Sequence, residues 1–153
     1  MKLLKKKDKS DEYIIVIGCG RLGSHLASLL SRDGCSVVII DKDEKSFSSL
    51  EQDFGGFTIE ADGIEDEVLR EAKIDQADVL VATTDDDNAN IMIAQIAKVI
   101  YKVPKVIARL HDPNRYKIYQ ELDIETVSPT VLSALEFQNI IARDFEDIEE
   151  AKK

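Results

Sequence analysis

The sequence alternates regularly between short apolar runs rich in β-branched residues and longer amphipathic stretches. The runs are too short for buried helices, and they lack the strict alternation of a strand that faces water on one side. They are typical of strands in a parallel sheet, where both faces are covered. Strands are therefore predicted at Tyr13–Ile17, Ser36–Ile40, Phe57–Ala61, Asp78–Ala82, Lys105–Arg109 and, more weakly, Glu125–Val127.

The stretches between these strands carry apolar residues at helical spacing. One face of a first helix, which runs to about Asp33, is marked by Leu22, Leu26, Leu29 and Leu30. Four further helices are marked by Phe47, Leu50 and Phe54, by Val68, Leu69 and Ala72, by the segment 91–101, and by Tyr116, Ile118, Tyr119 and Leu122. Right-handed crossovers between parallel strands place helices on both faces of a sheet. The predicted fold is α/β: a Rossmann-like, doubly wound sheet of six parallel strands.

A glycine-rich motif joins the first predicted strand to the first predicted helix. Its residues, Gly18-Cys19-Gly20-Arg21-Leu22-Gly23, match the pattern GxGxxG. Here a strand precedes the motif, a helix follows it, and Asp41 ends the next strand 18 positions after Gly23. Dinucleotide-binding folds require this arrangement. The alternative is a glycine-rich turn that binds nothing.

Each part of this motif has a physical role in binding a nucleotide. Gly18 permits a tight turn, Gly20 lets the backbone approach a phosphate, and Gly23 lets the helix pack closely on the strand. The free N–H groups and the dipole at the helix start favour an anion. Asp41 would accept hydrogen bonds from two ribose hydroxyls, which disfavours a 2′-phosphate at that place. The sequence therefore predicts an adenine nucleotide other than NADP.

Further candidate contact residues lie where later strands end, at the edge where an open sheet binds ligands. They are the Ala61–Asp62 turn, Thr84, Asp85 and Arg109. Thr84 or Asp85 either caps the following helix alone or also contacts the ligand. Arg109 either binds a phosphate bidentately or forms a surface ion pair. Arg21, in the glycine loop, is either next to a bound phosphate or a solvated residue at the helix start.

We expect neither catalytic residues nor a metal site. His25 in the first helix and His111 after the fifth strand have no serine, cysteine or carboxylate at a spacing typical of a triad or a metal site. Cys19 is near a helix start, a position that depresses the pKa of a thiol. No resolving partner for it is evident, so we interpret Cys19 as a small residue that fills the loop.

Charge and composition exclude several classes of protein. The 153 residues include 30 acidic and 20 basic side chains, and the net charge of −10 argues against nucleic-acid binding. No run reaches the length of a transmembrane helix. The start MKLLKKKDKSDE lacks the apolar segment of a secretory signal. Cys19 and Cys35 lack metal-type spacing and suggest a reducing compartment, so a cytoplasmic protein is expected.

The motifs GCGRLG, IIDKD, IEADG, TTDDDNAN and IAR, in this order, resemble the N-terminal RCK domain of potassium-transport regulators, also called the KTN or TrkA-N domain. The resemblance covers about residues 13–145. An arginine in the glycine loop, followed by T-x-D-D-x-x-N and A-R, distinguishes this family from ordinary dehydrogenases. The nucleotide contacts that the motifs and the resemblance together imply are Gly18, Cys19, Gly20, Arg21, Leu22, Gly23, Asp41, Lys42, Ala61, Asp62, Thr84, Asp85 and Arg109.

The resemblance implies a nonenzymatic regulatory subunit that binds NAD(H), AMP, ADP or ATP. It also implies a homo- or hetero-oligomer of RCK-type subunits on the inner face of the membrane, where a Trk- or Ktr-type potassium channel or transporter is the partner. Two features depart from the family pattern. The turn after the third strand reads Ala61-Asp62-Gly63 instead of a Gly-Asp pair. The second, C-terminal lobe is missing, so we expect that another polypeptide supplies it or that the subunit regulates without it.

A last helical pattern follows Pro129. Its apolar residues are Val131, Leu132, Leu135, Ile140, Ile141, Phe145 and Ile148. Since five helices already cover the predicted sheet, we expect this helix to cross onto a neighbouring subunit; the alternative is that it folds back on its own domain. The expected division of the chain is a flexible basic N-terminus at 1–12, a nucleotide-binding domain at 13–128 and a C-terminal dimerisation helix at 129–153.

Two other functions stay open at this point. One is an NAD-dependent oxidoreductase, which the length disfavours because hydride transfer needs a substrate pocket facing the nicotinamide. The other is a stand-alone nucleotide or redox sensor whose target is not a transporter. The link to a transporter depends on the resemblance alone.

Overall fold

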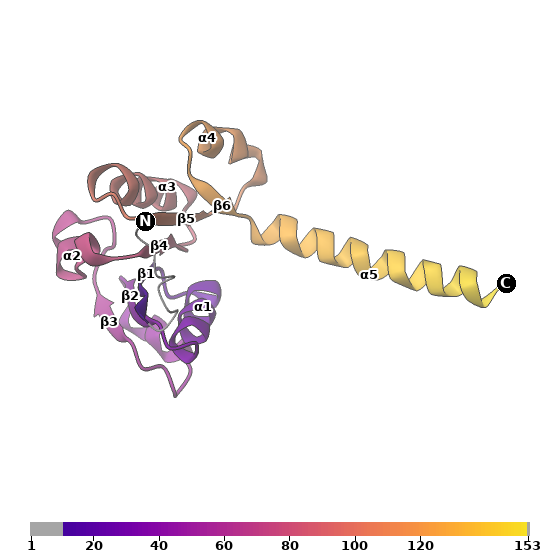
Figure 1. Ribbon diagram of the computed structural model, residues 1–153, viewed down its shortest axis with the longest axis horizontal. Coiled ribbons are helices and arrows are strands. Elements are labelled where there is room, and N and C mark those ends of the chain that lie inside the picture. The colour runs from indigo at the N-terminus through magenta and orange to yellow at the C-terminus, as the bar shows by residue number, and fades with distance from the viewer. Residues whose placement is uncertain (1–10, 153) are drawn as a thin grey trace, which may run out of the picture.

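Six parallel strands form one sheet in the order β3-β2-β1-β4-β5-β6, in a computed structural model that describes residues 11–152 (Figure 1). The strands are β1 (Tyr13–Ile17), β2 (Ser36–Asp41), β3 (Phe57–Glu60), β4 (Val79–Ala82), β5 (Lys105–Arg109) and β6 (Glu125–Val127). The predicted Rossmann-like fold is confirmed. Nearly all of the predicted flexible N-terminus, residues 1–12, lies outside the described residues.

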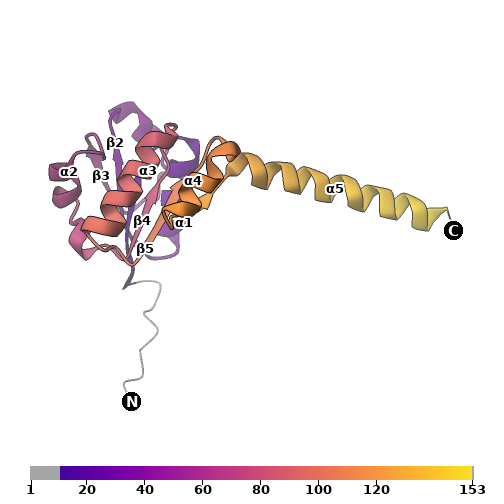
Figure 2. The ribbon, with the colours of Figure 1, turned by 90° about the horizontal axis from the view of Figure 1, so that it is seen from above.

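The helices are α1 (Arg21–Arg32), α2 (Asp66–Glu71), α3 (Asp87–Gln95), α4 (Tyr116–Glu121) and α5 (Pro129–Ala151), and α3 continues as a π-helix over Ile96–Ile100. Short 3₁₀ turns occur at Glu44–Ser49, Ile74–Gln76 and Pro113–Arg115. Figure 2 shows α2, α3 and α4 on one side of the sheet. The chain order of strands reverses between β1 and β4, so the edge between them is the switch point at which such sheets bind ligands.

The core lies on both faces of the sheet because successive residues of a strand point to opposite sides. Ile15 and Ile17 of β1 belong to the cluster that includes residues of α2, α3 and α4. Ile14 and Val16 belong to the cluster on the other face, which includes Ala27 of α1. All four strand residues are buried, as the continuous apolar runs predict.

The predicted leucine face of α1 is not the most buried face of the helix. The buried residues of this helix are Gly23, Ser24, Ala27 and Ser28, whereas Leu29 is 41% exposed. Small side chains bring the helix close to the sheet: a Cβ atom on Gly23 would lie 1.8 Å from the carbonyl oxygen of Gly18. Of the four leucines, Leu30 still packs, partly buried, against the cluster on this face of the sheet.

The helix predicted from Phe47, Leu50 and Phe54 is also wrong, because only the 3₁₀ turn Glu44–Ser49 forms. Serines compete for backbone hydrogen bonds and are weak helix formers. The Ser48 hydroxyl, for example, donates to the Lys45 carbonyl at 2.7 Å. The three apolar residues still pack, partly buried, against the cluster on the α1 side of the sheet.

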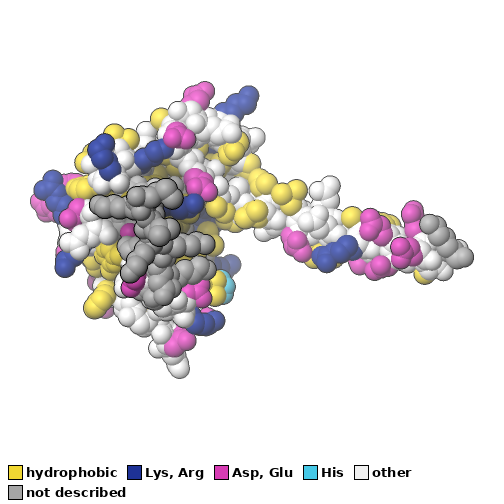
Figure 3. Space-filling model, viewed as in Figure 1, with side chains coloured by type: hydrophobic (Ala, Val, Ile, Leu, Met, Phe, Trp, Pro, Cys, Tyr) yellow, Lys and Arg dark blue, Asp and Glu magenta, His cyan; other side chains and the backbone are white. Residues whose placement is uncertain are grey.

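The last helix, α5, extends away from the domain (Figures 1 and 2). None of its residues is buried, and apolar side chains lie along it and near its base (Figure 3). The alternative that this helix folds back on its own domain does not hold in this structure. Among the described residues, no helix is both long and apolar enough to cross a bilayer.

Candidate functional site

A cavity of about 350 Å³ lies at the carboxyl edge of the sheet, next to the switch point between β1 and β4. Predicted nucleotide contacts in its lining are Gly18, Gly20, Asp41, Lys42, Ala61, Asp62, Thr84, Asp85 and Arg109. These residues come from the ends of five different strands and the turns that follow them. The fold therefore brings together, at one edge, side chains that are almost a hundred positions apart in the sequence.

The glycine turn between β1 and α1 forms one wall of this cavity. Gly18 has a φ of +100°, which L side chains rarely adopt, and a Cβ atom there would lie 2.8 Å from the backbone nitrogen of Thr84. A Cβ atom on Gly20, by contrast, would meet nothing within 4 Å. Gly18 thus serves the fold, whereas the bare backbone at Gly20 leaves open space in the cavity lining.

The start of α1 faces this space without a cap. Gly20 is the N-cap residue and has no side chain to accept a hydrogen bond from the first N–H groups, and the first turn contains no acidic residue. An uncapped helix start presents free N–H groups and the positive end of the helix dipole. The geometry favours an anion such as a phosphate beside the glycine turn.

Asp41, at the end of β2, connects the glycine turn to the next part of the cavity. Its Oδ2 accepts a hydrogen bond from the backbone nitrogen of Cys19 at 2.7 Å, and its Oδ1 accepts one from the backbone nitrogen of Asp43 at 2.8 Å. Each carboxylate oxygen has a further lone pair. The carboxylate is therefore fixed by the backbone and can still accept hydrogen bonds from ligand hydroxyls.

The turn after β4 differs from both alternatives considered from the sequence, since each of them made Thr84 or Asp85 the cap of α3. Neither Thr84 nor Asp85 caps α3; the N-cap is Asp86, whose Oδ1 accepts hydrogen bonds from the backbone nitrogens of Asn88 at 2.8 Å and Ala89 at 3.3 Å. Thr84 and Asp85 line the cavity. Their predicted role as caps is wrong, because capping falls to the next residue and leaves both on the cavity side.

Arg109 ends β5 and lines the cavity from the far side of the switch point. Among the described residues, no carboxylate lies within ion-pair distance of it, so the surface ion pair considered from the sequence is not formed. Its Nε atom is buried without a hydrogen-bond partner. Buried donors without a hydrogen-bond partner are rare in proteins. The guanidinium group is suited to a phosphate.

Four of the expected contacts do not line the cavity: Cys19, Arg21, Leu22 and Gly23. Arg21 is exposed at the first position of α1, and Gly23 is buried against the turn. The expectation of a depressed pKa at Cys19 is wrong. Burial of the thiol and, second, the nearby Asp41 carboxylate raise its pKa to about 11.

Sequence reasoning missed two buried residues of α3 that fix the backbone of neighbouring segments. Asn90 is fully buried and bonds to the Thr84 backbone and to the Arg109 carbonyl. Asp87 accepts hydrogen bonds from the backbone nitrogens of His111 at 2.6 Å and Asp112 at 2.9 Å. The segment TTDDDNAN contained both, but which acid or amide turns inward depends on the start of α3.

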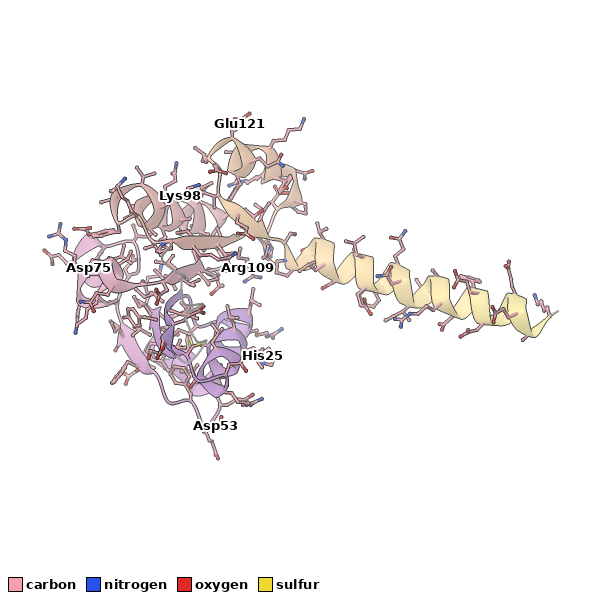
Figure 4. All side chains as sticks on the ribbon, viewed as in Figure 1. His25, Asp53, Asp75, Lys98, Arg109 and Glu121 are labelled. Carbon is pink, nitrogen blue, oxygen red and sulfur yellow. The ribbon has the colours of Figure 1, made fainter. Side chains whose placement is uncertain are left out.

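Neither His25 nor His111 lines the cavity. His25 is exposed on α1, and His111 is exposed after β5 (Figure 4 labels His25 and Arg109). Within residues 11–152, no group of three or more His, Cys, Asp or Glu side chains is placed to hold a metal ion. The chemistry that the arrangement supports is recognition of an anionic ligand with hydroxyl groups.

Comparison with known proteins gives concordant matches. The model of the TrkA-N domain family matches residues 14–129. The Trk system potassium uptake protein TrkA of Streptomyces coelicolor is 41% identical over 116 residues, which are 76% of this chain and 52% of that protein. The GsuK channel superposes with a TM-score of 0.76 at 26% identity, over 88% of this chain and 24% of that chain. The Kef CTD of Shewanella denitrificans, solved in an AMP-bound form, has a TM-score of 0.71 at 25% identity, over 82% of this chain and 77% of that chain.

Proposed function

The chain belongs to the TrkA-N domain family, and we propose that it is a nucleotide-sensing regulatory protein of a potassium-uptake system. It binds NAD(H), AMP, ADP or ATP in the cavity at the carboxyl edge of the sheet. The observation that carries this proposal is the convergence on one cavity of an uncapped helix start, the fixed Asp41 carboxylate and the orphaned Nε of Arg109. The first two suit phosphate and ribose, and the third supplies a charge for phosphate.

The match to TrkA of Streptomyces coelicolor supports the potassium-uptake part of the proposal, since that relative is a Trk system protein. The chain spans about half the length of that relative, so we carry over only the role of the shared domain. The AMP-bound form of the similar Kef CTD supports an adenine nucleotide as ligand. We propose a membrane potassium transporter or channel subunit as the partner, which places this protein at the inner, cytoplasmic face of the membrane.

We also propose that the protein acts as an oligomer. Eight large apolar side chains on α5 are at least 41% exposed, namely Val131, Leu132, Leu135, Phe137, Ile140, Ile141, Phe145 and Ile148. At the base of the helix, an apolar groove of about 400 Å³ is lined by Leu110, Pro113, Tyr116, Thr126, Val127, Ser128, Val131 and Leu132. Apolar surfaces of this extent are typical of protein–protein interfaces. A second copy or another RCK-type subunit would cover them.

Titration calorimetry with the full chain tests the ligand. We expect binding of at least one nucleotide among NAD, NADH, AMP, ADP and ATP, and weaker binding of NADP, because its 2′-phosphate would meet the Asp41 carboxylate. Tighter binding of NADP than of all five would refute this reading of the site. No detectable binding of any nucleotide would refute the proposed function itself.

An oxidoreductase is the competing function, and a turnover assay separates the two. We expect NADH, incubated with the protein and a hydride-accepting dye, and ATP, incubated with the protein alone, to be recovered unchanged by chromatography, because the cavity lining contains neither a histidine nor a nucleophile–base pair. Turnover that depends on the protein and disappears in His111→Ala would establish the enzyme instead.

A further inference from the structure

Asn90 is a fully buried polar residue that does not line the cavity, yet all of the hydrogen bonds of its side chain go to residues that do. Its Oδ1 accepts from the backbone nitrogen of Thr84 at 2.9 Å and from the Thr84 hydroxyl at 2.6 Å. Its Nδ2 donates to the Thr84 carbonyl at 3.0 Å and to the Arg109 carbonyl at 3.1 Å. Two donors and two acceptor sites are all that an asparagine side chain has.

These bonds join the ends of β4 and β5 beyond the point where the two strands are paired. The register between β4 and β5 ends at Ala82 and Ala108, so Thr84 and Arg109 lie beyond the last paired residues. Asn90, from the first turns of α3, bridges the two chain segments at this point. The Asn90 side chain therefore joins the backbone just after β4 to the last residue of β5, next to the cavity.

We propose that Asn90 is a positioning residue for the nucleotide site. It fixes the Arg109 backbone, so that the guanidinium group is held at the cavity, and it fixes Thr84 on the same rim. A site that is organised before the ligand arrives binds more tightly, because less conformational freedom is lost on binding. This inference rests on the proposed nucleotide site, and it assigns to Asn90 a role that acts through Arg109 and Thr84.

A purely structural role is the competing interpretation. A buried asparagine that satisfies three backbone groups stabilises the fold wherever it stands, and its removal leaves those groups unpaired. Both interpretations predict a lower melting temperature for Asn90→Ala. They differ in the affinity of the folded protein, which a structural role leaves unchanged.

The test compares AMP and NAD affinities by titration calorimetry of the full chain, at a temperature where melting curves show each variant to be folded. We expect Asn90→Ala to weaken binding about tenfold, the scale of one hydrogen bond to a charged group. If the alanine variant does not fold, Asn90→Ser takes its place. The serine hydroxyl is too short to bridge both segments, so we expect the same loss of affinity. Asn88→Ala is the matched control: Asn88 is exposed in the same turn and accepts from Arg115, outside the cavity.

A double-mutant cycle shows whether Asn90 acts through Arg109. We expect the loss of affinity in Asn90→Ala with Arg109→Ala to be smaller than the product of the two single losses, because the arginine has nothing left to position. Multiplicative losses would overturn the proposed role, as would folded Asn90 variants with wild-type affinity; in the latter case the nucleotide site would stand. A wild-type protein that binds neither AMP nor NAD would overturn the site and this role together.

Discussion

The carboxylate of Asp41 accepts a hydrogen bond from the backbone nitrogen of Cys19 at 2.7 Å, across 22 positions of sequence. This bond ties the end of β2 to the glycine turn after β1. In a dinucleotide-binding fold, the acid at the end of the second strand is a ribose ligand. Here it also holds the turn beside which a phosphate would bind, so that one side chain organises two parts of the proposed site.

Replacing Asp41 should therefore weaken binding of AMP or NAD more than it destabilises the fold. We expect Asp41→Ala to cost roughly 1–3 kcal/mol of binding free energy, the scale of hydrogen bonds to a charged group. Glu60→Ala is a matched control, because Glu60 pairs with Asp41 in the register of β2 and β3 but is exposed and does not line the cavity. Calorimetry that gives both variants the same affinity would exclude Asp41 as a ligand.

Two glycines of the same GxGxxG motif should respond oppositely to alanine. A Cβ atom on Gly20 meets no protein atom within 4 Å, so Gly20→Ala should change the free energy of unfolding by less than about 1 kcal/mol. Its methyl group would occupy the cavity side, and nucleotide affinity should fall by about tenfold or more. Thermal melting and calorimetry on the same samples measure the two effects.

Gly23→Ala is the reverse case and serves as the comparison. Its Cβ atom would lie 1.8 Å from the Gly18 carbonyl oxygen and 2.7 Å from the Thr83 hydroxyl. Overpacking of this kind destabilises a fold by about 1–3 kcal/mol. A stable Gly23→Ala protein, or a Gly20→Ala protein with wild-type affinity, would contradict the geometry of the turn.

The Cys19 thiol should be unreactive, which bears on the redox-sensor alternative. Burial and the Asp41 carboxylate raise its pKa from an ordinary value of about 9 to about 11. In a Cys35→Ser background, we expect Ellman's reagent at pH 8 to modify Cys19 only as fast as the protein opens, because the thiolate is the reactive form. Rapid modification of the folded protein, with loss of nucleotide binding, would favour a redox sensor.

The same raised pKa predicts a pH dependence of stability. Well below pH 9 the thiol is protonated in both the folded and the unfolded chain, so the full contribution of the shifted pKa to the free energy of unfolding is present. Between about pH 9 and 11 the unfolded chain loses this proton first, and the free energy of unfolding falls as pH rises. Denaturant titrations should show that Cys19→Ala lacks this part of the alkaline decline. An identical decline in both proteins would contradict the assignment.

The strands and the place of the cavity could be predicted from the sequence, because both depend on local patterns. Apolar runs identify buried strands without knowledge of their partners, and the turn at Gly18 has its own signature. The packing face of α1 could not be predicted, since small residues such as Ala27 are buried there while Leu29 is half exposed. How closely a helix approaches a sheet depends on both surfaces at once.

The hydrogen bonds of Asn90 and the capping role of Asp86 could likewise not be predicted from the sequence. Three consecutive acids and two asparagines in TTDDDNAN offer several possible caps, and the choice follows from where α3 begins. Asn90 acquires its role only because β4 and β5 are neighbours, which brings the Arg109 carbonyl within 3.1 Å. Tertiary neighbours, not spacing, decide which polar residue is buried.

The exposed helix α5 gives the prediction with the largest expected effect. A partner that buries its apolar side chains gains roughly 1.5–3 kcal/mol for each large one. A single helix of this length, none of whose residues is buried, also needs tertiary packing to be stable in water. We expect light scattering at tens of micromolar to give a dimer or larger oligomer for the full chain and a monomer for a chain that ends after Thr130.

Two neighbouring point variants sharpen this prediction, because they leave the length of the chain unchanged. Phe145 is 63% exposed on α5 and the adjacent Asp144 is also exposed. Phe145→Ser should raise the dissociation constant of the oligomer by about tenfold or more, because a large apolar anchor is lost, whereas Asp144→Ser should leave it nearly unchanged. A full chain that is already a monomer, or a shortened chain that still forms the same oligomer, would show that α5 is not the interface. The exposed apolar surface of α4, with Tyr116 and Ile118, would then be the next to be substituted.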